Sequence, residues 1–232
     1  MIQTISLQAR TGWFLSDNAY DRRWAAENPS AHFGWIPDSV RGLWFYHTQM
    51  YDSAISIVTR HSFESNPWSW IVMGRPTLLF FESPTSGQKG CTVAQCSQAI
   101  IALGNPVIWW GATLAIGILL FQWALRRDWR AGAVLAGLAA GYLPWFLYQQ
   151  RTIFNFYTVA FTPWVVLALT YVLGMMLGPA RQSEQLRKRG ALAAGMVVVL
   201  AVITFWYFLP VYNAQVIPQP SWSDRVWLPS WT

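Results

Sequence analysis

The stretch "NPVIWWGATLAIGILLFQWAL", Asn105 to Leu125, contains no acidic or basic side chain. A helix needs roughly 20 apolar residues to cross the hydrocarbon core of a bilayer. Three later stretches have the same character, at about Ala131 to Gln149, Phe156 to Leu177 and Gly190 to Tyr212. The sequence therefore predicts about four transmembrane helices. Because short polar segments connect them, successive helices must run antiparallel.

The composition agrees with a membrane protein. Of the 232 residues, 54% are hydrophobic and only 11% are charged, and the 16 tryptophans exceed what a soluble domain normally carries. The formal net charge of +6 then reflects membrane topology, and it gives no reason to expect a nucleic-acid partner.

The placement of the cations predicts the orientation. The connections "RRDWR" (Arg126 to Arg130) and "GPARQSEQLRKR" (Gly178 to Arg189) are rich in Lys and Arg, whereas "QRTIFN" (Gln150 to Asn155) has only Arg151. Short cationic loops stay in the cytoplasm. We therefore expect residues 16–104, the second connection and the tail 213–232 to be extracytoplasmic, and residues 105–212 to form the four-helix bundle.

The predicted outer segment contains one helical pattern and two cysteines. Val40 to Arg60 has apolar residues at helical spacing, which predicts an amphipathic helix outside the bilayer, with Asp38 or Ser39 available as its N-cap. Cys91 and Cys96 lie in a Gly/Ser-rich loop, where an oxidising compartment would allow a disulfide. The alternative is two free thiols.

No metal site is expected from the histidines. His32, His47 and His61 are far apart in the sequence and form no ligand spacing, so we interpret each as a packed or interfacial residue. No histidine lies close enough to the cysteines to complete a zinc site. The tail contains three prolines and the tryptophans Trp222, Trp227 and Trp231. This composition is typical of a stretch at the level of the lipid headgroups. The alternative is an unstructured end.

Two arginines are the candidate binding residues on the predicted outer side. Arg151 lies among aromatic residues in a short loop, and Arg75 lies between Gly74 and Pro76. A guanidinium pairs bidentately with a phosphate, here that of a lipid. The alternatives are an interfacial anchor for Arg151 and a salt bridge to Glu64 or Glu82 for Arg75.

The segment "SNPWSWIVMGRP", Ser65 to Pro76, places two tryptophans close together. Trp68 and Trp70 share one face in a strand but not in a helix, which Pro67 is suited to begin. Their rings could stack on a sugar or an isoprenoid chain, or anchor at the membrane interface. No carboxylate lies within a span, and no phosphate loop or nucleophile set is present. The residues alone thus indicate a lipid-facing outer pocket.

Five segments together resemble the C-terminal half of bacterial protein O-mannosyltransferases. They follow the same order over nearly the whole chain: "TGWFLSDNAYDRRW" (Thr11 to Trp24), "LWFYHTQMY" (Leu43 to Tyr51), "HSFESNPWSWIVMGRP" (His61 to Pro76), "ALGNPVIWW" (Ala102 to Trp110) and "RTIFNFY" (Arg151 to Tyr157). One departure is Ser62 and Phe63 after His61, where the family pattern is His-Pro-Tyr-x-Ser-x-Pro-Trp.

The resemblance implies an all-α polytopic membrane glycosyltransferase of the GT-C type, family 39. Such an enzyme transfers mannose from polyprenyl-phosphate-mannose to Ser or Thr of a secreted protein on the extracytoplasmic face, with no cofactor or metal. Arg151 and Arg75 would bind the lipid phosphate of the donor, and the wall of the donor pocket would be formed by His61, Trp68, Trp70 and Tyr157. The expected partners are the donor, the acceptor protein and membrane lipids.

The same resemblance implies that the catalytic carboxylate lies upstream. Family members are similar in carrying an Asp-Glu pair in a first extracytoplasmic loop, and no counterpart is present here. The resemblance also makes residues 1–15 the remnant of a preceding transmembrane span. We therefore expect a fragment that needs the N-terminal half of the enzyme and is inactive alone. The alternatives are a related transferase of another lipid-linked sugar, and a non-catalytic membrane subunit or small transporter, which would need polar residues between its spans.

Overall fold

The computed structural model describes residues 38–179 and 181–231 and divides into two compact units, residues 1–58 and 59–232. The described part of the first unit, residues 38–58, contains helix α3, Asp38–Ile55. A helix was predicted here, but it ends before Arg60. The expectations for residues 1–37, including the remnant span and His32, lie outside the described residues.

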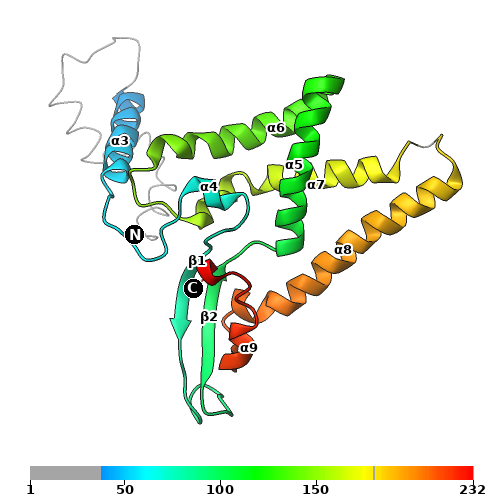
Figure 1. The fold of residues 1–232 in the computed structure, drawn as a ribbon. Helices are drawn as coiled ribbons and strands as arrows, with labels where there is room; N and C mark the ends of the chain where they lie inside the picture. The colour runs from blue at the N-terminus through cyan, green and yellow to red at the C-terminus, as the bar shows by residue number, and fades with distance from the viewer. Residues whose placement is uncertain (1–37, 180, 232) are drawn as a thin grey trace. The chain divides into compact units, whose positions relative to one another are not determined.

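The second unit contains the long helices and a small sheet (Figure 1). Its elements in chain order are α4 (Pro67–Trp70), β1 (Thr77–Glu82), β2 (Cys96–Ala102), α5 (Pro106–Arg126), α6 (Trp129–Tyr142), the 3₁₀ helices η1 (Leu143–Tyr148) and η2 (Asn155–Ala160), α7 (Thr162–Leu177), α8 (Glu184–Tyr212), β3 (Val216–Pro218), α9 (Gln219–Ser223) and η3 (Pro229–Trp231).

Within the described residues, three helical segments are long and apolar enough to cross a membrane: 106–126, 129–148 and 184–212. The third predicted stretch is shorter than expected, because residues 155–160 form η2 and the apolar helix α7 begins only at Thr162. Pro163 lies in its first turn, a position that proline favours. Helix α8 instead begins six residues before Gly190, because the cationic connection continues it as helix.

The connection between α5 and α6 is a tight reversal. Arg127 takes a left-handed conformation (φ 57°), and the Asp128 side chain accepts a hydrogen bond from the backbone N–H of Arg130, which caps α6. Helix α5 also packs against α7 and α8. Gly137 of α6 permits the close contact with α7, because a Cβ there would lie 2.3 Å from the Trp164 ring.

The sheet was not predicted. Its strands are antiparallel in the order β1-β2-β3, with Thr77 opposite Ala102 and Cys96 opposite Pro218. The strands are short, and a long loop rather than a two-residue turn joins β1 to β2, so the usual hairpin signal is absent. The disulfide between Cys91 and Cys96 is confirmed. The chain is otherwise mainly helical, as predicted.

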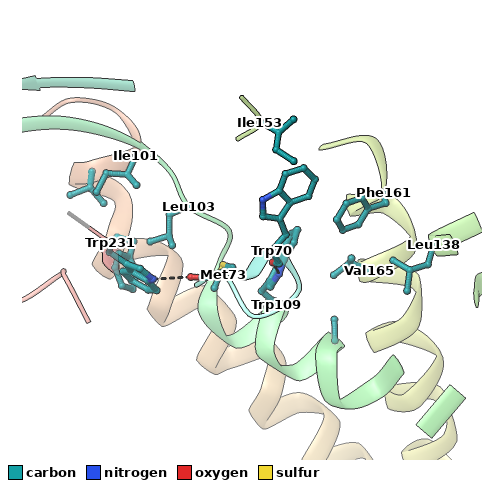
Figure 2. Close-up of a cluster of buried hydrophobic side chains, with 13 residues drawn as sticks. Trp70, Met73, Ile101, Leu103, Trp109, Leu138, Ile153, Phe161, Val165 and Trp231 are labelled. Atoms are coloured by element: carbon teal, nitrogen blue, oxygen red, sulfur yellow. Dashed lines mark hydrogen bonds between the residues drawn. The ribbon is translucent and has the colours of Figure 1, made fainter. Parts of the chain in front are cut away.

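The main core lies where the sheet meets one end of the long helices (Figure 2). It joins residues from the start of α5 and α7, such as Trp109 and Val165, to residues near the end of α8, such as Phe208. The starts of α5 and α7 and the end of α8 therefore lie together, as an antiparallel succession requires. Away from this core, many side chains on the long helices are exposed, for example Leu114 at 74%.

The tail is ordered and packs against this core. Arg225 donates through Nε to the carbonyl oxygen of Tyr207, at 2.7 Å, and its guanidinium lies 4.6 Å from the Tyr207 ring centroid. Trp231 is 1% exposed, whereas Trp227 is 42% exposed. The alternative of an unstructured end is therefore wrong for residues 213–231, and Trp231 belongs to the core rather than to a lipid-facing surface.

Candidate functional site

The short helix α4 positions the two tryptophans differently. The Asn66 side chain accepts a hydrogen bond from the backbone N–H of Trp68, at 3.1 Å, and Pro67 occupies the first turn. Because the segment is helical, the tryptophans point apart: Trp68 is 71% exposed and Trp70 is 0% exposed. Trp68 therefore remains a candidate for the wall of a pocket, whereas Trp70 cannot touch a ligand and can only support that wall from behind.

Side chains from distant elements donate hydrogen bonds to six backbone carbonyls of residues 67–74. The last carbonyls of a helix have no partner within it, so these bonds replace water. The donor and acceptor pairs are Tyr142 Oη to Pro67 (2.7 Å), Trp109 Nε1 to Trp70 (3.0 Å), Thr113 Oγ1 to Ile71 (2.6 Å), Trp110 Nε1 to Val72 (3.0 Å), Trp231 Nε1 to Met73 (2.8 Å) and Ser230 Oγ to Gly74.

Arg75 follows directly after this fixed segment. Its Nη2 donates to the carbonyl oxygen of Ser62 at 2.5 Å, and its buried Nε has no hydrogen-bond partner among the described residues. The alternative of a salt bridge to Glu64 or Glu82 is not found, because these carboxylates pair with Arg60 and Lys89 respectively. The Ser62 contact uses only the backbone, so the departure from the family pattern at Ser62 does not remove it.

Arg151 lines a polar cleft of about 140 Å³. The cleft is also lined by Arg60, Glu64, Ser65, Asn66, Gln149 and Ile153. Arg151 donates through Nη2 to the Tyr157 hydroxyl at 3.3 Å, and its guanidinium lies 5.7 Å from that ring's centroid. The buried Nε of Arg151 likewise has no partner within residues 38–179 and 181–231.

Segment 60–66 lies between the two arginines. Ser62 contacts Arg75, while the backbone N–H of Ser65 donates to the carbonyl oxygen of Ile153 at 2.9 Å, two residues from Arg151. The amide of Asn66 donates to Gln149 at 2.9 Å. The two arginines that the sequence analysis selected are therefore both held against one short segment.

The one carboxylate of the cleft is already neutralised. Partial desolvation acts to raise the pKa of Glu64, but the hydrogen bonds from the Arg60 side chain and the His61 backbone N–H outweigh it and lower this pKa below its ordinary value. Glu64 is thus ionised and paired with Arg60 at 2.7 Å. The Arg151 charge has no carboxylate partner in the described structure, which suits the binding of an anion.

Three residues predicted to form the wall of the donor pocket, His61, Tyr157 and Trp68, belong to an aromatic surface. Tyr157 places this surface beside Arg151. His61 packs edge-on against Phe154, with ring centroids 5.3 Å apart, and its Nδ1 accepts from the backbone N–H of Phe63. Tyr157 stacks on Trp145, with centroids 4.5 Å apart and an interplanar angle of 16°. Trp68 packs against Phe146 at 4.6 Å.

Sequence reasoning missed several residues of this region. Trp145 and Phe146 support the aromatic surface, Gln149 and Asn66 line the cleft, and Tyr142 holds α4. The available signal was the aromatic run "YLPWFLYQQR", Tyr142 to Arg151, which leads directly to the arginine. Its residues up to Gln149 belong to the second predicted membrane span, which is why their part in the site was not predicted.

Taken together, the fold and the site define a helical membrane protein with an aromatic surface at one end of its helices, beside an arginine that has no carboxylate partner among residues 38–179 and 181–231. Residues 39–231 match the family described as the C-terminal four TMM region of protein-O-mannosyltransferase, and the chain belongs to this family. The resemblance inferred from the sequence and the helical membrane fold are both confirmed.

Curated relatives are similar over almost the whole chain. The polyprenol-phosphate-mannose--protein mannosyltransferase of Mycolicibacterium smegmatis (strain ATCC 700084 / mc(2)155) is 33% identical over 98% of this chain, and that of Mycobacterium tuberculosis (strain ATCC 25618 / H37Rv) is 32% identical over 94%. The alignments cover 45% and 42% of these proteins, so the chain spans less than half of their length.

A solved structure shares the fold. The Saccharomyces cerevisiae protein O-mannosyltransferase Pmt1-Pmt2 complex, bound to its sugar donor, has a TM-score of 0.64 and 22% sequence identity. The match covers 86% of this chain and 27% of the yeast chain. This match shows that the two chains share a fold.

Proposed function

We propose that the protein takes part in transferring mannose from polyprenyl-phosphate-mannose to Ser or Thr hydroxyls of secreted proteins, on the extracytoplasmic face. The observation that carries this proposal is that Arg151 lines a polar cleft and pairs with no carboxylate among the described residues, since Glu64 of the cleft pairs with Arg60. The relatives of the chain are named for mannosyl transfer from this class of donor. Arg75, held against the same segment, supplies a second cation.

The chemistry gives these arginines a defined task. The acceptor hydroxyl attacks C1 of the mannose, the bond from C1 to the phosphate oxygen breaks, and the polyprenyl phosphate leaves with an additional negative charge. Guanidinium groups fixed beside that phosphate stabilise the charge as it develops. The hydroxyl proton needs a base. We assign that role to no described residue.

The aromatic surface would hold the donor next to these cations. Trp68 is exposed and packs on Phe146, and the Trp145–Tyr157 stack lies beside Arg151, so apolar faces and a charged group are adjacent. This combination suits a ligand with an isoprenoid chain, a phosphate and a sugar.

Substitution of Arg151 tests the proposal. In the full open reading frame that encodes this chain, we expect Arg151→Ala to lower mannosyl transfer to an acceptor peptide roughly a hundredfold, as removal of one charge-stabilising donor typically does. Arg151→Lys should restore only part of the rate, because it keeps the charge but loses the planar fork.

The matched control is Lys89→Ala, which removes a cation that already pairs with Glu82. We expect this variant to transfer mannose at the unsubstituted rate. Full activity in Arg151→Ala would contradict the assigned role, and transfer from a different lipid-linked sugar in preference to mannose would redirect the proposal to another donor.

A further inference from the structure

The last two described residues of the tail hold the turn that precedes Arg75. Trp231 donates through Nε1 to the carbonyl oxygen of Met73 at 2.8 Å, and Ser230 donates through Oγ to that of Gly74 (Figure 2 shows the first bond). These bonds join positions 158 and 156 residues apart in the sequence. We refer to Ser230 and Trp231 as the tail clasp.

The turn that the tail clasp contacts, Met73 and Gly74, has an unfavourable backbone conformation. Met73 has φ 52°, a left-handed conformation that costs free energy for a residue with a side chain. Gly74 is crowded by Ser69, since a Cβ on it would lie 3.0 Å from the Ser69 Cβ. Two carbonyl contacts from the tail therefore stabilise a backbone that local preferences disfavour.

The direction of Arg75 depends on this turn. Its guanidinium has one described hydrogen bond, to a backbone carbonyl, and its Nε has no partner in the described structure. Pro76 restricts the backbone on the other side of Arg75. With so little to orient the side chain itself, its placement follows from the geometry of Met73 and Gly74.

We propose that Ser230 and Trp231 are positioning residues for Arg75, holding its guanidinium where it meets the lipid phosphate of the sugar donor. This inference rests on the proposed function and extends it, because it makes the far end of the chain part of the donor site. The clasp itself does not touch the donor. If the tail only filled the core, it would contribute to the stability of the fold and would not affect the binding of the donor phosphate by Arg75.

The test is a double-mutant cycle in the full open reading frame, with radiolabelled polyprenyl-phosphate-mannose as donor. Trp231→Phe keeps the ring in the core but removes the N–H, leaving a buried carbonyl without its donor. We expect the KM for the donor to rise about five- to thirtyfold, with kcat changing less. In an Arg75→Ala background the same substitution should cause no further rise, because the residue it positions is absent.

The matched control is Trp227→Phe, on the same tail, whose ring stacks on that of Trp231 at a centroid distance of 6.3 Å. We expect it to leave the KM unchanged. Ser230→Ala removes the second bond of the tail clasp without altering the core, and it should raise the KM for the donor in the same way. This variant replaces Trp231→Phe in the experiment if Trp231→Phe does not fold.

The possible outcomes distinguish a failure of the positioning role from a failure of the proposed function. An equal rise of KM with and without Arg75, or no rise for either clasp variant, overturns the positioning role while the proposed function stands. If the unsubstituted protein neither binds nor transfers the radiolabelled donor, the proposed function fails, and the positioning role fails with it.

Discussion

At the scale of single residues, one carboxylate ties two helices together at the end away from the core. Asp128 caps α6 and also accepts a hydrogen bond from the hydroxyl of Tyr171 in α7. The Tyr171 bond, followed by the backbone N–H of Arg130, holds the pKa of Asp128 below its ordinary value, against a smaller effect of desolvation. This position makes the stability of the connection sensitive to acid.

The sign of that sensitivity follows from linkage. Because the folded pKa is lowered, the ionised Asp128 stabilises the fold above its ordinary pKa of 3.8, and the contribution is lost as the pH falls through the lower folded pKa. We expect Tyr171→Phe to lower the unfolding temperature at pH 7 and to lower it less at about pH 3.

Tyr207→Phe is the control, since Tyr207 donates to a backbone carbonyl, that of Asp224, at 2.8 Å. Its effect should not change over the same pH interval. Thermal unfolding of the detergent-solubilised protein, followed by tryptophan fluorescence, measures both variants. An equal loss for Tyr171→Phe at both pH values would contradict the assignment to Asp128.

At the scale of elements, α4 is too short to be stable on its own and depends on its neighbours. An isolated helix of four residues does not form in water. Here Trp109 of α5 and Tyr142 of α6 donate hydrogen bonds to two of its carbonyls, and the tail donates to the turn that follows it. The sequence indicated a stiff segment from its prolines and tryptophans. It did not indicate the partners, because a tryptophan N–H has no periodic signature and its acceptors lie about 40 residues away.

Removing one of these bonds should destabilise the protein measurably. Thr113→Val is nearly isosteric but leaves the Ile71 carbonyl without the hydroxyl at 2.6 Å, so we expect a loss of roughly 1–3 kcal/mol in the free energy of unfolding. Thr170→Val is the control, because the Thr170 hydroxyl bonds only to its own helix, at the carbonyl of Val166. Denaturant titration in detergent compares the two variants, and equal losses would mean that the bond to the Ile71 carbonyl contributes nothing specific.

At the scale of the whole chain, the apolar stretches predicted the long helices and the resemblance predicted the family, because both signals are carried by many residues in order. The sheet, the late start of α7 and the burial of Trp70 and Trp231 were not predicted. Each of these depends on contacts between segments distant in sequence. For the same reason the sequence selected Arg75 and Arg151 separately but not the segment 60–66 against which both lie.

The orientation of the helices in the membrane is a prediction that labelling can check. The cationic connection before α8 and the polypeptide after it lie at opposite ends of one long helix, Glu184–Tyr212. Because Lys and Arg favour the cytoplasmic side, the start of α8 should be inside and its end outside. Gln185→Cys and Gln215→Cys form a matched pair of exposed reporters, and the native Cys91 and Cys96 are joined in a disulfide.

With a membrane-impermeant maleimide, Gln215→Cys should react in intact cells, and Gln185→Cys only after the membrane is opened. This result would place segment 60–66, the Arg151 cleft and the tail clasp on the side where secreted proteins emerge. Reaction of Gln185→Cys in intact cells would reverse the topology. The cleft would then face the cytoplasm, where a secreted acceptor is not presented, and the proposed transfer would lose its physical basis.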